Sequence, residues 1–505
     1  DATAVNPSRT LVLDGGAGDD TFVFRTSGIA SRDTIAGGAG QDKLLFATAG
    51  TIAAAAFAHI GGVDEIDLTN GANRLTLSDA LVAASDNKSL TVAGGVGSDT
   101  IDARAVGPSR TLVLDGGAGK DTFELDPAQL TASDRIAGGT GRDYLSFTSA
   151  GTIAAAALAQ VGGVDAIALS GGTNSLTVSA AVAAQSDSHL LTVYGDRTTG
   201  ALTVDASAVG ADDRVSLVAG AGPATLRGGA GNDAFKLTGR QLSADDTIAG
   251  GAGTDYLWLT LPGVTAASAF AHVGGIDRIY LANGVNQLTL SDALVAASDN
   301  DRLIVVGGAG NDTIDATAVD PSRGLAFNSD GGSDTFVFTA SGLSANDTIN
   351  ASGGYNRLVL ATAGAIGAAA FAHVDGVREI DLAGETNSLT VSDAMVTQSD
   401  HHLLVVDGHL TTTGLAVDAS GVGAGNAVII VAGAGADTLQ GGAGKDTFEL
   451  DPAQLTASDR IAGGAERDYL SFTAAGTIAA SAFAQVGGID AIALSGGTNS
   501  LTVSA

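Results

Sequence analysis

Aspartates recur in this sequence at a fixed spacing, and most of them close a glycine-rich stretch such as LDGGAGDDTFVF, residues 13–24. A 22-residue step links the members of each run: Asp20, Asp42, Asp64 and Asp86; Asp99, Asp121, Asp143, Asp165 and Asp187; Asp233, Asp255, Asp277 and Asp299; Asp312, Asp334, Asn356, Arg378 and Asp400; Asp446, Asp468 and Asp490. A carboxylate in this place either helps a loop to hold a cation, or bonds its own backbone as a turn residue that caps the next strand.

The residues after each aspartate predict a β-strand. Apolar side chains usually stand two and four positions after it, as with Phe22 and Phe24 after Asp20. Alternation at i and i+2 is the period of a strand and not of a helix. A strand at a fixed phase of a 22-residue period predicts an all-β fold, a right-handed parallel β-solenoid (β-roll or β-helix) with about 22 residues per coil. The aspartates would then line up along a single edge.

A longer repeat contains the shorter one. Similar segments begin at Asp1, Asp102, Asp205, Asp315 and Asp418. They predict five repeat units in one continuous solenoid, the last of them truncated: 1–101, 102–204, 205–314, 315–417 and 418–505. We expect the chain to be a segment of a longer array. An Ala-rich insert that begins at Thr51 and returns in every unit predicts a loop or a short helix.

The run of aspartates is interrupted in two ways. A 13-residue step leads from Asp86 to Asp99, and a 46-residue step leads from Asp187 to Asp233. Both steps recur further along the chain, and the second residue after the last aspartate before each interruption is polar: Lys88, His189, Asp301 and His402. The spacing therefore predicts two kinds of junction between coils.

Composition excludes several functional classes. The chain has 24 Lys and Arg against 55 Asp and Glu, a formal net charge of −31, so its field repels nucleic acid and anionic membranes and attracts cations. Cysteine is absent, which excludes disulfides and thiolate chemistry. The start of the chain, DATAVNPSRT, does not read as a signal peptide, and no apolar span of about 18 residues predicts a membrane helix.

Signals for catalysis are weak. Acidic pairs occur throughout the chain, but they belong to a repetitive pattern, whereas a glycosidase needs one distinctive pair. His59, His272 and His373 recur at one insert position where other units have Gln160 and Gln485, which favours packing over catalysis. Glycine-rich strings occur without the strand–helix unit that nucleotide binding needs.

Nine of the loops carry the full string G-G-x-G-x-D followed by x and an apolar residue, as in GGAGDDTFV at 15–23. These loops resemble the RTX nonapeptide family, whose pattern is GGxGxDxUx. The resemblance implies a parallel β-roll with Ca²⁺ held between successive loops by aspartate carboxylates and loop carbonyls. The metal ligands that it implies are Asp20, Asp42, Asp99, Asp121, Asp143, Asp233, Asp255, Asp312 and Asp446.

The sequence also departs from the RTX pattern. A coil of the family holds two nonapeptides, about 18 residues, whereas the aspartates here are 22 apart. Nonapeptides stand in tandem at 219–233 and 432–446. Glu466 replaces a loop glycine, and an arginine such as Arg378 could itself occupy a cation position.

These observations predict a non-enzymatic, calcium-stabilised extracellular repeat protein of a bacterial cell surface. It would form part of a surface layer (S-layer), a filament or an adhesin stalk, self-associate, and meet cell-surface polysaccharide as a further partner. The resemblance implies type I secretion, with an uncleaved signal beyond Ala505. Two alternatives stay open: a β-helical polysaccharide-modifying enzyme, and a calcium-dependent secretion module of a larger enzyme.

Overall fold

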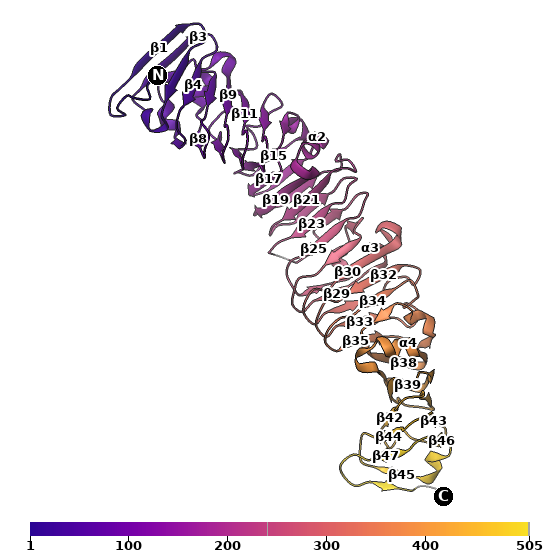
Figure 1. Cartoon of the computed structure of the whole chain (residues 1–505). Helices are drawn as coiled ribbons and strands as arrows, with labels where there is room; N and C mark the ends of the chain where they lie inside the picture. The colour runs from indigo at the N-terminus through magenta and orange to yellow at the C-terminus, as the bar shows by residue number, and fades with distance from the viewer. Residues whose placement is uncertain (240, 503–505) are drawn as a thin grey trace. The chain divides into compact units, whose positions relative to one another are not determined.

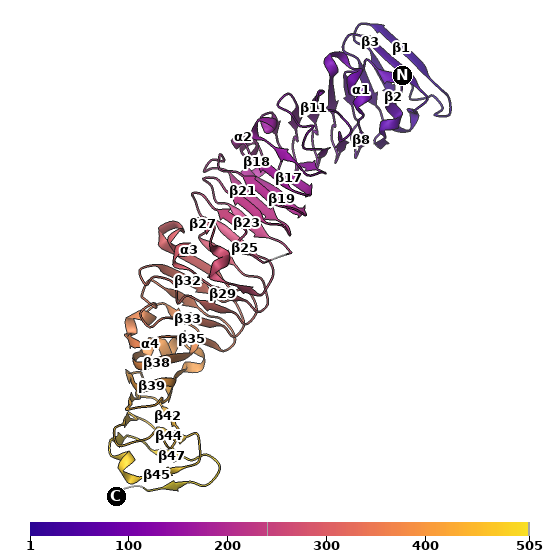
Figure 2. The same ribbon diagram turned by 180° about the vertical axis from the view of Figure 1, so that it is seen from behind.

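The computed structural model describes residues 1–239 and 241–502, and these residues fall into two compact units. The first unit consists of residues 1–239 and 245–257, and the second of 241–244 and 258–502. In both units short strands pair in parallel with the strands of neighbouring coils (Figures 1 and 2). The predicted parallel β-solenoid is confirmed.

Many neighbouring coils of the first unit stack with the predicted 22-residue register. Strand β2 (Thr21–Phe24) pairs with β4 (Lys43–Phe46), so that Phe22 lies beside Leu44 and Phe24 beside Phe46. The same step joins β10 (Thr100–Asp102), β12 (Thr122–Leu125) and β14 (Tyr144–Phe147). The apolar residues that follow each aspartate fill the interior, where Phe24 and Phe46 are fully buried.

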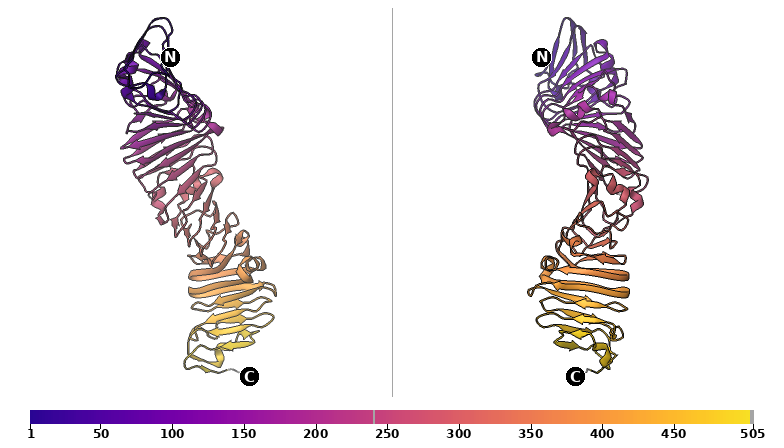
Figure 3. Two further views of the ribbon diagram at one scale, coloured as in Figure 1. Left: turned by 60° about the vertical axis from the view of Figure 1, so that its left-hand side comes forward. Right: turned by 90° about the vertical axis from the view of Figure 1, so that its right-hand side faces the viewer.

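The second unit repeats this arrangement. The same 22-residue register is seen in β31 (Thr313–Asp315), β33 (Thr335–Phe338), β35 (Asn356–Leu360), β42 (Thr447–Leu450) and β44 (Tyr469–Phe472). The right-hand view of Figure 3 shows the orange and yellow strands stacked one on another. Phe336, Phe338, Phe448 and Phe472 fill the interior.

Shorter, 18-residue coils occur where two nonapeptides follow one another. Strand β21 (Arg214–Ala219) pairs with β23 (Ala234–Leu237) so that Ser216 meets Ala234, and β40 (Ala427–Val431) pairs with β42 so that Ile429 meets Thr447. These coils have the length typical of the RTX family. The other coils are longer because a non-glycine segment replaces one of the two nonapeptides.

The Ala-rich insert forms a two-residue strand and a 3₁₀ helix. In the first repeat these are β5 (Thr51–Ile52) and η2 (Ala54–Phe57), and Phe57 anchors the helix by its buried ring. Later copies of the helix are η4 (Ala155–Leu158), η6 (Ala267–Phe270), η8 (Ala368–Phe371) and η10 (Ala480–Phe483). Of the two predicted forms, the short helix is confirmed.

The described residues also contain four short α-helices that the sequence did not predict. They are α1 (Asp79–Ala83), α2 (Ala180–Ala184), α3 (Asp292–Ala296) and α4 (Asp393–Gln398). Each begins after a serine cap, as where Ser78 Oγ accepts a hydrogen bond from Leu81 N at 3.3 Å. Helices of this length show too little of the 3.6-residue period to be recognised. Within residues 1–239 and 241–502, none of the helices is long and apolar enough to cross a membrane.

The aspartates form straight rows, but the prediction of a single edge is wrong. In the first unit, the row from Asp20 to Asp86 precedes strands of one sheet, and the row that starts at Asp99 precedes strands of another. In the second unit, Asp299 precedes β30 (Arg302–Val306), whereas Asp312 precedes β31 of a different sheet. The 13-residue step is shorter than one circuit of the backbone. It therefore moves the row to another side of the coil.

The backbone conformation explains why the residues before each 13-residue step are polar. Asn87 and Lys88 both adopt the left-handed conformation, with φ of 53° and 56°, and so do Asn300 and Asp301. Two successive left-handed residues turn the chain sharply and leave the second side chain outside the core. Asparagine and aspartate tolerate this conformation better than apolar residues do.

Glycine is required where the loops of successive coils touch. A Cβ on Gly119, whose φ is 140°, would lie 1.8 Å from the carbonyl oxygen of Gly97 in the preceding coil. We therefore expect Gly119→Ala to lower the free energy of unfolding by roughly 2–4 kcal/mol. Gly210→Ala is the control, because no atom lies within 4 Å of its Cβ position. Calorimetry would contradict this account if both variants lost the same stability.

Candidate calcium sites

We call the aspartates that recur at 22-residue steps the ladder aspartates. In most of the full glycine loops, one oxygen of the ladder aspartate accepts a hydrogen bond from the backbone of the coil before it. Asp121 Oδ1 accepts a hydrogen bond from Asp99 N at 2.7 Å, and Asp143 Oδ1 accepts one from Asp121 N at 2.7 Å. The same bond is made by Asp42, Asp255, Asp334 and Asp468. The turn-residue interpretation is therefore half right, since the carboxylate caps the neighbouring coil and not its own backbone. This bond also fixes where the second oxygen points.

The second oxygen is buried and faces another acceptor. Asp121 Oδ2 and the carbonyl oxygen of Gly138 lie 2.5 and 2.6 Å from the position that a Cβ on Gly116 would take. Asp20 Oδ2 and Gly37 O surround Gly15 in the same way, at 2.6 and 2.4 Å. We call the carboxylate Oδ2 and the carbonyl of the following loop the acceptor pair. Two acceptors at one point repel each other unless a cation or a donor lies with them.

Most of the predicted ligands have this unpaired oxygen. Among the described residues, no hydrogen-bond donor reaches the buried Oδ2 of Asp20, Asp42, Asp99, Asp121, Asp143 and Asp312. The same holds for Asp334 and Asp468, which the RTX resemblance left out because their loops lack the full glycine string. An unpaired carboxylate oxygen in a carbonyl-lined pocket fits Ca²⁺, which takes about six to eight oxygen ligands.

Asn356 shows what happens when a donor replaces the carboxylate. Its Oδ1 accepts from Asp334 N at 2.9 Å, as a ladder aspartate would. Its Nδ2 donates to the carbonyl of Gly353 at 2.8 Å and to that of Gly376, in the following coil, at 3.3 Å. The amide therefore satisfies the carbonyl that elsewhere faces a second acceptor. The loop carbonyls that Asn356 reaches therefore have a hydrogen-bond donor without a cation.

Asp233 and Asp446 bind the chain differently from the other predicted ligands. Their Oδ2 atoms accept hydrogen bonds at 2.6 Å from Gly229 N and Gly442 N, respectively. The 18-residue coil brings these glycine N–H groups within reach of the carboxylate. Their assignment as metal ligands stays a prediction, as it does for the other seven residues, Asp20, Asp42, Asp99, Asp121, Asp143, Asp255 and Asp312.

Burial disfavours the charged form of these carboxyls. Loss of solvent raises the pKa of Asp143 and of Asp312 from 3.8 to about 6, and it raises the pKa of Asp233 to the same value. The pKa values of Asp99 and Asp121 also rise, with burial as the largest cause. A bound cation would oppose this shift, because it stabilises the ionised carboxylate.

A second row of buried aspartates was missed from the sequence. Asp134 Oδ1 accepts from Leu112 N at 2.8 Å, and its Oδ2 accepts from Thr131 N at 2.8 Å and Thr131 Oγ1 at 2.9 Å. Asp33, Asp347 and Asp459 are bonded in the same way. Both oxygens are satisfied, so these residues hold coils together without an ion. The sequence signal that could have identified them is an aspartate followed by any residue and then isoleucine, as in Asp134-Arg-Ile.

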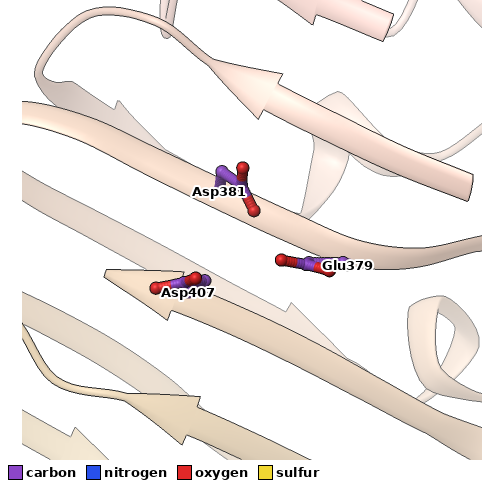
Figure 4. Close-up of side chains that lie close together, drawn as sticks. All are labelled: Glu379, Asp381 and Asp407. Atoms are coloured by element: carbon purple, nitrogen blue, oxygen red, sulfur yellow. The ribbon is translucent and has the colours of Figure 1, made fainter. Parts of the chain in front are cut away.

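Three further carboxylates gather on the outer face of a sheet in the second unit. Glu379 and Asp381 on β38 (Val377–Ser392) and Asp407 on β39 (Leu403–Gly421) offer oxygens within 4.8 Å of one another (Figure 4). Arg357 forms an ion pair with Asp381, and Asp407 Oδ1 lies 2.6 Å from His409 Nδ1. A cationic side chain already lies in this cluster, which we interpret as an ion-pair network.

The suggestion that an arginine could take the cation position is not supported at Arg378. Its guanidinium lies over the ring of Tyr355, 5.0 Å from the ring centroid. Glu466, the other departure from the loop pattern, keeps a glycine-like backbone with φ of 66°. The loop shape therefore persists where the glycine is lost.

Comparison with known families agrees with this geometry. The family model of the RTX calcium-binding nonapeptide repeat matches residues 12–24, 27–45, 131–146, 216–235, 242–260, 304–318 and 429–451. The chain carries RTX calcium-binding nonapeptide repeats. RTX repeats bind Ca²⁺, which identifies the ion that the acceptor pairs fit. The matched RTX segments include both 18-residue coils and most of the predicted ligands. No curated protein matches the chain.

Replacing a ladder aspartate by asparagine tests the acceptor pair. Asp121→Asn should let an amide donate to the Gly138 carbonyl, as Asn356 does in its coil. Without calcium the variant should be more stable than the parent by about 1–3 kcal/mol, the usual cost of an unsatisfied buried polar group. The further stabilisation that calcium gives should be smaller than in the parent. Differential scanning calorimetry with chelator and with Ca²⁺ measures both effects.

Asp134→Asn is the matched control, because Asp134 is equally buried but fully bonded. An amide there would point its N–H₂ at two donors, so the variant should lose about 1–3 kcal/mol with and without calcium. Equal behaviour of the two variants would contradict the distinction between the two rows of aspartates.

The raised pKa values predict an unusual pH dependence. Because the folded-state pKa of Asp143 is about 6 against 3.8 for the exposed group, the folded chain binds more protons than the unfolded chain. This contribution to stability is present below about pH 4 and is lost as pH rises through about 6. The melting temperature in chelator should therefore fall between pH 4 and pH 7, and saturating Ca²⁺ should remove this fall. If the protein in chelator has its highest melting temperature at neutral pH, the raised pKa values of these carboxyls are contradicted.

Proposed function

We propose that the chain is an extracellular, non-enzymatic structural protein of a bacterial cell surface, with RTX coils that Ca²⁺ stabilises. It would serve in a surface layer, a filament or an adhesin stalk. The observation that carries the proposal is the row of buried, unpaired carboxylate oxygens, each opposite a carbonyl of the next coil. A protein with such rows gains folding free energy from every ion that it binds.

Calcium dependence of this kind suits secretion. RTX repeats are typical of secreted proteins, and calcium is scarce inside cells and abundant outside them. The buried carboxylates lower the stability of the fold where the ion is absent, so the chain would fold less readily before export by a type I route. A site whose ion is present at 100 times its dissociation constant adds about 2.7 kcal/mol.

The near-identity of distant segments supports a structural role. Residues 119–180 and 444–505 differ at 6 of 62 positions. Repetition of one surface provides identical contacts at intervals, which is what lateral packing or polymerisation of a second copy requires. We therefore include self-association in the proposal.

Calcium titration of folding and assembly tests this function. With chelator the chain should melt at a lower temperature and stay soluble; with millimolar Ca²⁺ its melting temperature by circular dichroism should rise, and it should then sediment as ordered polymers visible by electron microscopy. Mg²⁺ is the control ion, because its shorter bonds and rigid octahedral preference fit an irregular carbonyl pocket poorly. A melting temperature that Ca²⁺ does not raise, or a chain that stays monomeric at all calcium concentrations, would contradict the proposal.

A β-helical polysaccharide-modifying enzyme is the second candidate. A groove on the first unit with tyrosine, lysine and arginine side chains favours it, because such an enzyme needs one distinctive polar cluster. Incubation with a panel of acidic polysaccharides, followed by chain-length analysis, separates the two candidates. Shortened or modified products would replace the structural function by an enzymatic one. Whether the chain serves a larger enzyme as its secretion module is answered by the full-length sequence.

A further inference from the structure

A groove crosses the outer face of one sheet in the first unit. Its volume is about 370 Å³, and it crosses β12, β14, β17 (Ala166–Gly171) and β19 (Leu190–Thr198). Its polar lining consists of Lys120, Thr122, Tyr144, Ser146, Tyr194, Asp196 and Arg197. Successive strands are about 4.8 Å apart, so four strands give a length of roughly 14 Å. This length suits a short oligomer better than a single small ion.

The tyrosines hold cationic side chains at the groove. Lys120 Nζ lies 4.8 Å from the centroid of the Tyr144 ring, and the guanidinium of Arg142 lies 5.6 Å from it. Arg142 Nη2 also donates a hydrogen bond to Tyr194 Oη at 2.9 Å. These contacts restrict two long, flexible side chains before any ligand arrives. The entropic cost of binding is therefore lower.

The loop pattern explains how these cations came together. Lys120 and Arg142 both occupy the x position before the ladder aspartate, in loops of adjacent coils. The 22-residue register stacks these positions one above the other. The position before the aspartate can hold any residue in the RTX pattern, and here it supplies the positive charge at the groove.

A β-bulge supplies the opposite rim. Ala168 pairs with Tyr194, but Ser170 pairs with Arg197, so β19 carries one extra residue here. A bulge bends the strand and re-aims the side chains next to it. It places Asp196 and Arg197, both exposed, at the groove together with Tyr194.

The charges around the groove select a class of ligand. Lys120 and Arg197 line the groove together with one carboxylate, Asp196, and Arg142 lies beside it, in a chain whose net charge is −31. The neighbouring acid Glu124, which pairs with Ser146, is already bound by Arg74 and Arg104. At physiological ionic strength charges beyond about 8 Å are screened, so the local cations outweigh the distant acids. Asp196 would repel a ligand that is anionic throughout, but it would accept hydrogen bonds from hydroxyl groups. Thr122 and Ser146 add hydroxyls that both donate and accept.

We propose that this groove binds an acidic polysaccharide, a chain of sugars that carry both carboxylate and hydroxyl groups. Carboxylates of the glycan would pair with Lys120 and Arg197, and its hydroxyls would bond Asp196. The inference rests on the proposed extracellular function, which it deepens by naming the class of partner. An acidic peptide satisfies the cations but offers Asp196 few hydroxyl donors.

Isothermal titration calorimetry on the calcium-loaded chain tests the proposal. The probes are oligogalacturonate, a neutral cello-oligosaccharide of equal length and oligoglutamate, in about 0.15 M salt. We expect binding of the uronate alone. The double variant Lys120→Gln with Arg197→Gln should weaken it at least about tenfold, since each charge-assisted hydrogen bond usually contributes more than that factor.

Lys236→Gln is the matched control: Lys236 is exposed on β23 and does not line the groove, so uronate binding should be unchanged. Absence of uronate binding, equal binding of oligoglutamate, or equal loss in the control would each overturn the proposal. Calcium-dependent folding and polymer formation are measured on the same variants. Their loss with binding intact contradicts the structural function alone, and their persistence without binding contradicts the groove alone. Cleavage of the bound uronate would confirm the groove and replace the structural function.

Discussion

The structure depends on one local conflict, a buried carboxylate oxygen that has no hydrogen-bond donor and shares the space beside a loop glycine with a carbonyl oxygen. The conflict arises in ladder aspartates such as Asp121 and Asp143, where Oδ1 is bonded to the backbone of the preceding coil and Oδ2 is left beside the following loop. Ca²⁺ bound at this place would remove the conflict and would join two coils at once. Stability of the coils is thereby tied to the composition of the surrounding solution.

Close approach of the loops makes this arrangement possible and also limits it. Glycine is needed at the first loop position, since a Cβ there would fill the space between Asp121 Oδ2 and Gly138 O. Side chains are free at the x position before the aspartate, where Lys120 and Arg142 stand. The RTX pattern thus separates residues that build the coil from residues that give each coil its surface.

Much of the fold could be predicted from the sequence because its cause is local and repeated. Apolar residues two and four positions after each aspartate set the strands, and their 22-residue spacing sets the register. The change of sheet between Asp86 and Asp99 could not be predicted, because a 13-residue step does not state where on the coil the chain resumes. Asp134 was missed because one aspartate after Thr131 reads as an ordinary turn. The unpaired state of Asp121 Oδ2 depends on the carbonyl of Gly138, which belongs to the following loop, and no local pattern reports it.

The Asn356 coil has a consequence for the order of folding. Its amide already bonds the loops on either side, so this part of the second unit has no electrostatic reason to wait for the ion. It could act as a starting point for folding in a chain where other loops, such as those of Asp121 and Asp143, keep an unpaired carboxylate oxygen. Further coils can then add to a surface that is already formed. The entropic cost of closing the first coil is in that case met without bound calcium.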